Sequence, residues 1–485
     1  MEGAKAILLR LFRRARGAMP SRSDSPRCAV APRSKSPKGK LAWWASPHAP
    51  GRKAVAVALS FVLVAGVGSL AGCSSDLGGG GSAAGVAVDG GEADSFGSAS
   101  DSGEAASFAE VAAAFDASAL DLDYSKRDTD ASYDDASAVH IVLGGGSASV
   151  EGNGATVDGS TVTITAEGVY VVSGSLDDGQ LAVEAPEDAK VQIVLAGATI
   201  HNEDGPAVYV KQADKCFITL ADGTQNALTD GAEYVLEDGS DEPYATLFSR
   251  ADLTLNGTGA LTVTSAYRHA VCSKDDLVIT GGTYVVNAVE DALRGRDCVK
   301  IADGDFTLIA GGDGIKSNKD TKATKGFVSI DGGTFVIEAG DDGIHAQTYL
   351  RIAGGDISIA AVDDALHSNL EGLLAGGALD IEAGDDAFHV ETKLVIDDGT
   401  VNVKACYEGY EAEKLYINGG DTHIVASDDA INAAAADLGD DDADEAADAS
   451  VEAPGSEDGA LPGGMEAPEG APDGMTPPDG VNGMD

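Results

Sequence analysis

The chain has 485 residues, of which 63 are glycine and 5% are aromatic, and its formal net charge is −48 at pH 7. This composition is unusual for a helical or α/β enzyme. So acidic a chain repels nucleic acid and anionic lipid, and a divalent cation would have to bridge it to any acidic ligand.

The N-terminal segment has the pattern of an export signal. Residues 1–53 hold 13 Lys or Arg against 2 Asp or Glu, and an apolar run follows at 54–70. This run is short for a helix that stays in a membrane. The sequence LAGC at 70–73 resembles a bacterial lipobox, in which the cysteine is lipidated and becomes the mature N-terminus. We therefore expect 1–72 to be a basic n-region plus a lipoprotein signal peptide, with Cys73 as an extracytoplasmic lipid anchor on the bacterial cell surface; an uncleaved signal anchor is the alternative.

Composition then divides the rest of the chain into three parts. Residues 73–136 are rich in Gly, Ser, Ala and Asp, which predicts a flexible linker with a possible short helix at 108–120. Residues 137–433 consist of short alternating apolar runs separated by GG, DG and NG turns, which predicts an all-β region. Residues 434–485 are acidic and rich in Pro and Gly, which predicts a disordered tail.

One acidic phrase recurs within the β region, as AGDDGIHAQ at 339–347, AVDDALHSN at 361–369 and AGDDAFHVE at 383–391. Such a period in a Gly-rich β chain is typical of a solenoid, and 22 residues can make one coil of three short strands and three turns. We therefore predict a parallel β-helix with about 22 residues per coil; a propeller blade needs roughly 40 residues. The second acidic position falls at Asp291, Asp313, Asp342, Asp364, Asp386, Glu408 and Asp429, at spacings of 22, 29, 22, 22, 22 and 21 residues.

Stacked coils would align the residues of this phrase in columns. The residue two after the acid is apolar in each repeat and should point inward, and the next residue is polar and should point outward. The inward column reads Leu293, Ile315, Ile344, Leu366, Phe388, Tyr410 and Ile431. The outward column reads Arg294, Lys316, His345, His367, His389, Glu411 and Asn432.

The acids themselves should form a ladder, because parallel strands lie about 4.8 Å apart. Two like charges about 5 Å apart repel by roughly 1 kcal/mol in water and about 3 kcal/mol near a protein surface. Either turn N–H groups cap the carboxylates, or cations lie between them; we expect Ca²⁺, which takes six to eight oxygen ligands. The candidate metal ligands are Glu290, Asp291, Asp313, Asp341, Asp342, Asp363, Asp364, Asp385 and Asp386.

Two further observations bear on this ladder. Arg268 and His269 occupy the acidic positions one coil before Asp291, so a cation site should begin near Asp291. A transition-metal site along His345, His367 and His389 is the third possibility for the same column, although a histidine beside an aspartate is more often its hydrogen-bond partner.

Four cysteines follow Cys73, and their spacing does not pair them. Disulfides and buried packing positions both remain open for them. They are Cys216, Cys272, Cys298 and Cys406.

The succession of GVYVVSGSLDDGQLAVEA, LFSRADLTLNGTGALTVTSAY, DDLVITGGTYVV and GGDGIKSNKD resembles the bacterial carbohydrate-binding-domain-containing proteins, over about 155–432. This resemblance implies a right-handed parallel β-helix like that of polysaccharide lyases. It also implies calcium bound along the helix and binding of plant-type polysaccharides such as polygalacturonate and cellulose.

Three functions fit these observations. The first is a non-catalytic, calcium-assisted polysaccharide-binding protein. The second is a pectate-lyase-like enzyme, in which calcium acidifies a proton and Lys316 or Arg294 removes it. The third is an adhesin or structural surface protein with a non-glycan ligand. Sugar stacking would depend on residues such as Tyr407 and Tyr410, although Tyr410 falls in the inward column.

Overall fold

The computed structural model describes residues 106–236 and 239–433, and the predicted signal peptide, Cys73 and the tail lie outside these ranges. The described part is nearly all β, as predicted. Among these residues, no helix combines the length and the apolar character that a membrane span requires.

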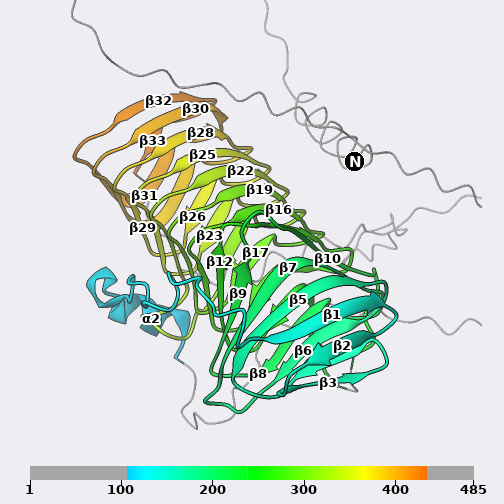
Figure 1. The fold of residues 1–485 in the computed structure, drawn as a ribbon. Coiled ribbons are helices and arrows are strands. Elements are labelled where there is room, and N and C mark those ends of the chain that lie inside the picture. Colours follow the sequence, from blue (N-terminus) through cyan, green and yellow to red (C-terminus); the bar gives the residue numbers. More distant parts are fainter. Residues whose placement is uncertain (1–105, 237–238, 434–485) are drawn as a thin grey trace, which may run out of the picture. The chain divides into compact units, whose positions relative to one another are not determined.

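The strands form a parallel solenoid, in which each strand pairs with its counterparts in the coils before and after it (Figure 1). Every coil contributes to three stacks, named here A, B and C. Stack A contains β8 (Val208–Gln212), β11 (Ala245–Ser249), β14 (His269–Ser273), β17 (Leu293–Gly295), β20 (Ile315–Ser317), β23 (Ile344–Ala346), β26 (Leu366–Ser368) and β33 (Ile431–Asn432). Stack B contains β9 (Lys215–Leu220), β12 (Asp252–Gly257), β15 (Asp276–Ile279), β18 (Cys298–Ile301), β21 (Phe327–Ile330), β24 (Tyr349–Ile352) and β27 (Glu371–Leu374). Stack C contains β10 (Gln225–Asp230), β13 (Ala260–Thr264), β16 (Thr283–Asn287), β19 (Asp305–Ile309), β22 (Thr334–Ala339), β25 (Asp356–Ala361), β28 (Ala378–Glu382), β30 (Thr400–Cys406) and β32 (Asp421–Ala426).

Longer strands bend from one stack into the next. β29 (Phe388–Ile396) and β31 (Tyr410–Ile417) run from stack A into stack B, and β7 (Lys190–Asn202) pairs with both β9 and β10. At the N-terminal end, β5 (Gly168–Leu176), β6 (Gln180–Glu184) and β4 (Thr161–Ile164) continue the parallel pairing.

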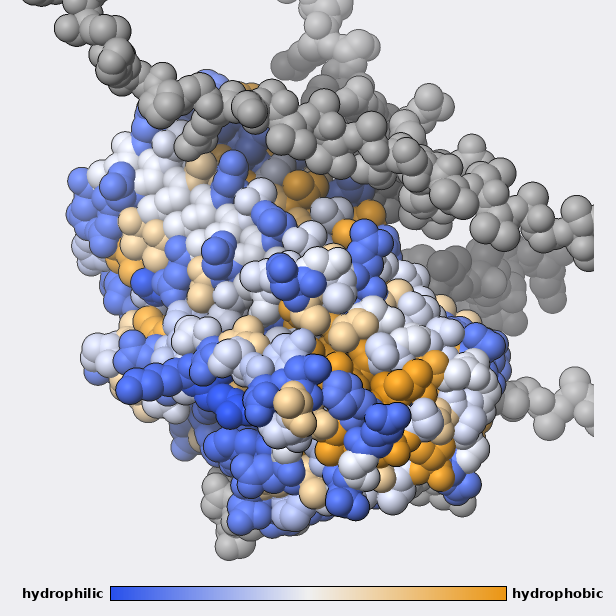
Figure 2. All heavy atoms as spheres, viewed as in Figure 1, coloured by the Kyte–Doolittle hydropathy of each residue, from blue (hydrophilic) through white to orange (hydrophobic). Residues whose placement is uncertain are grey.

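Two antiparallel hairpins lie at the N-terminal end. β1 (Val139–Gly145) pairs with β2 (Ala148–Glu151), and β3 (Ala155–Asp158) pairs with β4. β1 and β4 also pair in parallel with β5 and β6, so the parallel ladder ends at β1 and β4, and the antiparallel strands β2 and β3 cover this end. Figure 2 shows apolar side chains gathered around β1 and β5, where Val142 is 47% exposed.

The register confirms the predicted columns. Ile344 pairs with Leu366 and Ile315 pairs with Ile344, so the 29-residue spacing is one coil with an insertion. The inward column is buried from Leu293 to Tyr410, which accounts for the core along this side. Ile431 is the exception, at 52% exposure, because the described residues include no coil beyond it.

Backbone approach explains the small residue between the acid and the apolar residue of the phrase. A Cβ added at Gly343 would lie 2.5 Å from the carbonyl oxygen of Ala365 and 2.5 Å from Ile359 Cγ2. The corner between stacks B and C needs glycine for another reason, because Gly333 has a φ of 107°, which L-residues rarely adopt.

Residues 106–130 include the short helix predicted at 108–120 and contact the solenoid through a few buried side chains, which differs from the flexible linker predicted for 73–136. They contain α2 (Phe108–Ala114) and a short 3₁₀ helix (Ala117–Ala119). Leu120 packs against Cys298, Phe327 and Tyr349 on the outer face of stack B, and Lys300 Nζ donates to the carbonyl oxygen of Asp123 at 2.8 Å. The composition of this segment gave no sign of these contacts, because few residues make them.

Asp128 fixes the end of this segment. Its side chain is buried, pairs with Lys215 Nζ at 2.8 Å and accepts a hydrogen bond from Thr254 Oγ1 at 2.7 Å. The segment is thereby held against the solenoid by a buried ion pair rather than by apolar area alone.

The four cysteines of the described residues are free and buried, so none of them forms a disulfide. Burial raises the pKa of Cys216 and of Cys272 to about 12, which makes these thiols unreactive packing groups.

Candidate functional site

The corner between stacks C and A places the acids of the repeated phrase in two rows. The inner acidic row, defined as Asp291, Asp313, Asp342, Asp364 and Asp386, is at most 5% exposed. In each coil the Oδ1 atom accepts a hydrogen bond from the backbone N–H at the equivalent position of the next coil. These bonds join Asp313 N to Asp291 (3.1 Å), Asp342 N to Asp313 (3.0 Å), Asp364 N to Asp342 (3.0 Å), Asp386 N to Asp364 (2.8 Å) and Glu408 N to Asp386 (3.2 Å).

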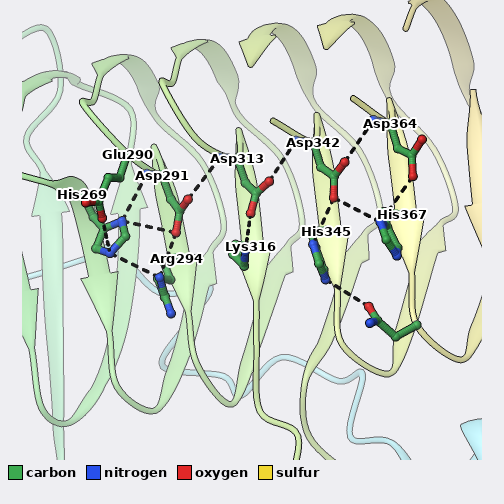
Figure 3. A network of polar contacts seen from close by, with 11 residues as sticks. His269, Glu290, Asp291, Arg294, Asp313, Lys316, Asp342, His345, Asp364 and His367 are labelled. Atoms are coloured by element: carbon green, nitrogen blue, oxygen red, sulfur yellow. Dashed lines mark hydrogen bonds and ion pairs between the residues drawn. The ribbon is translucent and has the colours of Figure 1, made fainter. Parts of the chain in front are cut away.

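Stacked carboxylates were expected to be stabilised either by backbone N–H groups or by cations. The continuous row of hydrogen bonds shows that backbone N–H groups cap the inner acidic row. It leaves the second oxygen, Oδ2, of each aspartate directed toward the outward column of stack A (Figure 3). The partner of Oδ2 differs from coil to coil along the solenoid, and this difference decides which coils could hold a metal ion.

His269 is the first acceptor of the row, a role that the sequence did not reveal. The backbone N–H of Asp291 donates to His269 Nδ1 at 3.1 Å, as the next coils donate to Oδ1. A nitrogen that accepts carries no proton, and burial lowers the pKa of His269 to about 3 despite the opposing charge of Asp291. The coil of Arg268 and His269 therefore continues the ladder instead of interrupting it.

The carboxylates of the first coils of the corner are neutralised by basic side chains of the protein. Arg268 Nε lies 2.9 Å from Glu290 Oε2, Arg294 lies 3.1 Å from Asp291 Oδ2, and Lys316 Nζ lies 2.8 Å from Asp313 Oδ2. Three predicted metal ligands, Glu290, Asp291 and Asp313, therefore already have protein cations beside them. Further along the corner, Asp363 is a carboxylate of the described residues with no ion pair, so such carboxylates lie further from Asp291 than the sequence indicated.

In the later coils, the aspartates of the inner acidic row face histidines. Asp342 Oδ2 lies 3.0 Å from His345 Nδ1 and 3.2 Å from His367 Nδ1, and Asp386 Oδ2 lies 3.3 Å from His389 Nδ1. The three rings are stacked, with centroids 4.6 Å and 5.0 Å apart. The structure thus brings together all three predicted histidines, and Figure 3 shows two of them directed at the inner acidic row.

The pKa values of these histidines are shifted in different directions. Burial lowers the pKa of His389, but hydrogen bonds with Asp386 and Glu391 outweigh it and raise that pKa to about 11. Hydrogen bonding to Asp342 likewise raises the pKa of His345 against the effect of burial, whereas burial and the neighbouring rings lower the pKa of His367. The pKa of the middle ring is thus shifted toward the neutral form and those of the outer two toward the charged form, which limits repulsion within the stack.

The outer acidic row, defined as Asp341, Asp363 and Asp385, lies toward solvent. Among the described residues, no ion pair involves Asp363 or Asp385. Partial burial and the carboxylates around it raise the pKa of Asp363 to about 6, and the pKa of Asp385 is raised for the same reasons. Carboxylate oxygens of Asp363, Asp364 and Asp385 lie within 4.8 Å of one another, so they could share a cation.

A further cluster of acidic residues continues the site, and two of its members, Glu408 and Glu411, were absent from the predicted ligands. Ligand atoms of Asp386, Glu408 and Glu411 lie within 4.8 Å of one another, and burial together with Asp386 raises the pKa of Glu411 to about 7. The 22-residue period already placed Glu408 and Glu411 in the two columns, so extending the ladder by one coil would have found them.

Two aromatic candidates for sugar stacking are separated by the fold. Tyr410 is 1% exposed and belongs to the core, as its column predicted. Tyr407 is 48% exposed, and its hydroxyl donates to Asp428 at 3.0 Å.

The fold and the acidic corner together define a class, the parallel β-solenoids with stacked carboxylates. Within it, residues 158–372 and 364–444 match the family described as carbohydrate-binding domain-containing protein, so more than half of the chain is matched. The chain belongs to the carbohydrate-binding domain-containing family, which confirms the resemblance found in the sequence.

Two related proteins are similar to parts of this chain. A carbohydrate-binding domain-containing protein of Acetivibrio thermocellus is 38% identical over 119 residues, which are 24% of this chain and 42% of that protein. The chain therefore matches less than half the length of this relative. A solved structure, the gadolinium derivative of a polysaccharide lyase-like protein from C. thermocellum, is 30% identical in sequence to this chain, with a TM-score of 0.46. The match covers 59% of this chain and 99% of the chain in that structure.

Proposed function

We propose that this member of the carbohydrate-binding domain-containing family is a non-catalytic protein that binds acidic, plant-type polysaccharide with the help of Ca²⁺. The observation that carries the proposal is the outer acidic row, whose carboxylates repel one another while the inner row behind them is already capped by backbone N–H groups.

The residues present fit calcium. Ca²⁺ takes six to eight oxygen ligands in flexible geometry, and the outer acidic row supplies carboxylate oxygens on the solvent side. One group offers three carboxylates within 4.8 Å, namely Asp363, Asp364 and Asp385. Asp363 and Asp385 would hold the ion, because no protein cation competes for them. When bound, Ca²⁺ would supply the positive charge that this corner lacks.

That charge matters for the ligand. With a net charge of −48, the chain repels a polyuronate at long range. An ion at an exposed corner has open coordination positions for a uronate carboxylate, and the coils repeat such a corner at about 4.8 Å intervals along one line. A linear acidic polymer laid along this line would meet successive bridging sites.

The alternative of lyase activity loses its candidate bases. A general base must be able to accept a proton at working pH. Burial lowers the pKa of Lys316, but Asp313 and Asp291 outweigh it and keep that pKa above its ordinary value. Arg294 is paired with Asp291 and its guanidinium is permanently charged. Neither residue is therefore suited to remove a proton from a uronide, which supports a binding role.

The proposed location follows from the LAGC sequence at 70–73. A lipid on Cys73 would hold the protein at the extracytoplasmic face of the bacterial membrane, and the residues between Cys73 and α2 would separate the anchor from the solenoid. Attachment is tested by metabolic labelling with a fatty acid, which Cys73→Ala should abolish.

The binding proposal is tested by co-sedimentation of the purified protein with insoluble polysaccharides, first with calcium and then with chelator. Binding that is lost on chelation supports it. Binding that survives chelation would place the ligand away from the acidic corner, and binding to no polymer would favour an adhesin with a non-glycan ligand.

A further inference from the structure

We propose that Asp342, His345 and His367 form a site for one divalent transition-metal ion of the zinc class, separate from the calcium positions of the outer acidic row. Asp342 Oδ2 lies 3.0 Å from His345 Nδ1 and 3.2 Å from His367 Nδ1, and Figure 3 shows both rings directed at this carboxylate. The three ligand atoms lie within 4.8 Å of one another. One carboxylate and two imidazoles with an open fourth position are a set that Zn²⁺ commonly takes.

The hydrogen bond at the far side of His345 fixes which nitrogen can bind the metal. His345 Nε2 lies 3.0 Å from the amide oxygen of Asn369, which only accepts, so Nε2 carries a proton. When the ring is neutral, its lone pair is therefore on Nδ1 and points at the Asp342 carboxylate. A lone pair facing a carboxylate oxygen requires either a proton or a metal ion between them.

His367 is free to become the second imidazole ligand. Its Nδ1 lies 3.2 Å from Asp342 Oδ2 and 3.3 Å from Asp364 Oδ2, whereas its Nε2 is buried and has no hydrogen-bond partner among the described residues. Because Nε2 has no partner, no contact on that side of the ring fixes which nitrogen carries the proton. The Nδ1 proton can therefore move to Nε2, which leaves Nδ1 as a ligand without breaking a bond on the far side of the ring.

Asp342 is prepared for a single metal bond. Its Oδ1 is already used by the backbone N–H of Asp364, at 3.0 Å, so Oδ2 alone remains to bind. This fixed carboxylate and the fixed His345 tautomer are the features that orient metal ligands in proteins.

The ligand types distinguish this site from its neighbours. Asp364, Asp386 and His389 form a second group within 4.8 Å, but with two carboxylates and one imidazole. Imidazole nitrogens suit zinc-class ions and carboxylate oxygens suit calcium. The pair of imidazoles therefore places the zinc-class ion at Asp342, while His389 Nε2 is held by Glu391 at 3.2 Å.

The test is calorimetric titration of the full chain with Zn²⁺ in excess Ca²⁺ and without glycan, so that its outcome is independent of the proposed function. One ion should bind, with release of the His345 Nδ1 proton seen as an enthalpy that changes with the buffer. His345→Ala and His367→Ala should weaken binding at least about 100-fold, and Asn369→Ala about 10-fold. Co²⁺ in place of Zn²⁺ should give the strong visible absorption of a four-coordinate site.

Two controls keep the placement testable. His389→Gln alters the same stack outside the site, and His423→Gln alters an exposed histidine of β32; both should change the affinity by less than about 3-fold. Thermal melts followed by circular dichroism identify any variant that fails to fold. Absence of Zn²⁺ binding by the wild type would overturn the proposal, and so would equal loss in His389→Gln or full binding by His345→Ala and His367→Ala.

Discussion

Asp342 accepts a hydrogen bond through Oδ1 from the backbone N–H of Asp364, one coil further along, at 3.0 Å. The same relationship recurs from Asp291 to Glu408, so each buried carboxylate joins two coils. Because Oδ1 is used within the fold, only Oδ2 and the outer acidic row remain for ligands. The corner is therefore both a structural seam and a candidate binding site.

Asp342→Asn should destabilise the protein more than Asp364→Asn. Burial raises the pKa of Asp342, but hydrogen bonds from His345 and His367 outweigh this and hold that pKa well below its usual range, whereas burial and Asp342 raise the pKa of Asp364. An amide resembles the protonated acid, so it suits the Asp364 position better. We expect losses of about 3 kcal/mol and about 1 kcal/mol in the free energy of unfolding, measured with urea in chelator. Equal losses would mean that the two carboxylates have the same charge state.

Asp363→Asn should stabilise the calcium-free protein at pH 7. The pKa of Asp363 is raised to about 6 in the folded state, so the folded state binds more protons than the unfolded state between about pH 4 and 6, and stability falls as pH rises through this window. After allowance for solvent screening, the gain is about 1 kcal/mol at pH 7 and vanishes near pH 4. Urea unfolding at both pH values measures it.

A matched control for this gain is Asp398→Asn. Asp398 is also exposed but lies at the corner between stacks B and C, and it should leave stability unchanged within about 0.5 kcal/mol. A gain of the same size in both variants would show that overall net charge, rather than the acidic row, is responsible.

Two histidines of the same corner should titrate in opposite directions. His269 accepts a backbone N–H and its pKa is lowered to about 3, so it should stay neutral at pH 5; the pKa of His389 is raised to about 11, so it should stay charged at pH 8. For His389 the associated stability is complete below about pH 6.5 and is lost as pH rises through the folded pKa. Ring nitrogen chemical shifts measured by NMR across this range report both states, and a midpoint near 6.5 for either ring would contradict the hydrogen bonds described here.

Lys316→Met should destabilise the protein by about 3 to 5 kcal/mol, because it leaves the buried Asp313 carboxylate without its cation. Adding Asp313→Asn should restore part of this loss, since the remaining group is neutral. Chemical unfolding of the single and double variants gives both numbers. If Lys316 were instead a catalytic base, wild-type protein would release an unsaturated product from polygalacturonate, and the double variant would regain stability without that activity.

Much of the fold followed from the sequence because a solenoid repeats its pattern. The inward column from Leu293 to Tyr410 and the outward column beginning at Arg294 were readable from a 22-residue period alone. The contacts of the segment at 106–130 were not, because Leu120 and Asp128 make them one residue at a time, without a period to reveal them.

The site was predicted in position but not in detail. Spacing placed the acids and histidines at one corner, yet it could not show that Oδ1 of the inner row caps backbone N–H groups. Nor could it show that His269 replaces an aspartate as acceptor, because that role depends on an unprotonated ring nitrogen. Arg294 and Lys316 pair with the aspartates of their own coils, so Asp291 and Asp313 are not open for a cation, whereas Asp363 and Asp385 are without an ion pair among the described residues.

The most direct test of the central claim is co-sedimentation with polygalacturonate gel, with calcium, of the wild type and of two double variants. Asp363→Asn/Asp385→Asn removes the exposed acids of the proposed site, and Asp397→Asn/Asp398→Asn removes two adjacent exposed aspartates of another corner. Our account predicts that the first variant loses binding by about 10-fold or more, while the second binds as the wild type does and loses binding in chelator. Undiminished binding by Asp363→Asn/Asp385→Asn would contradict it.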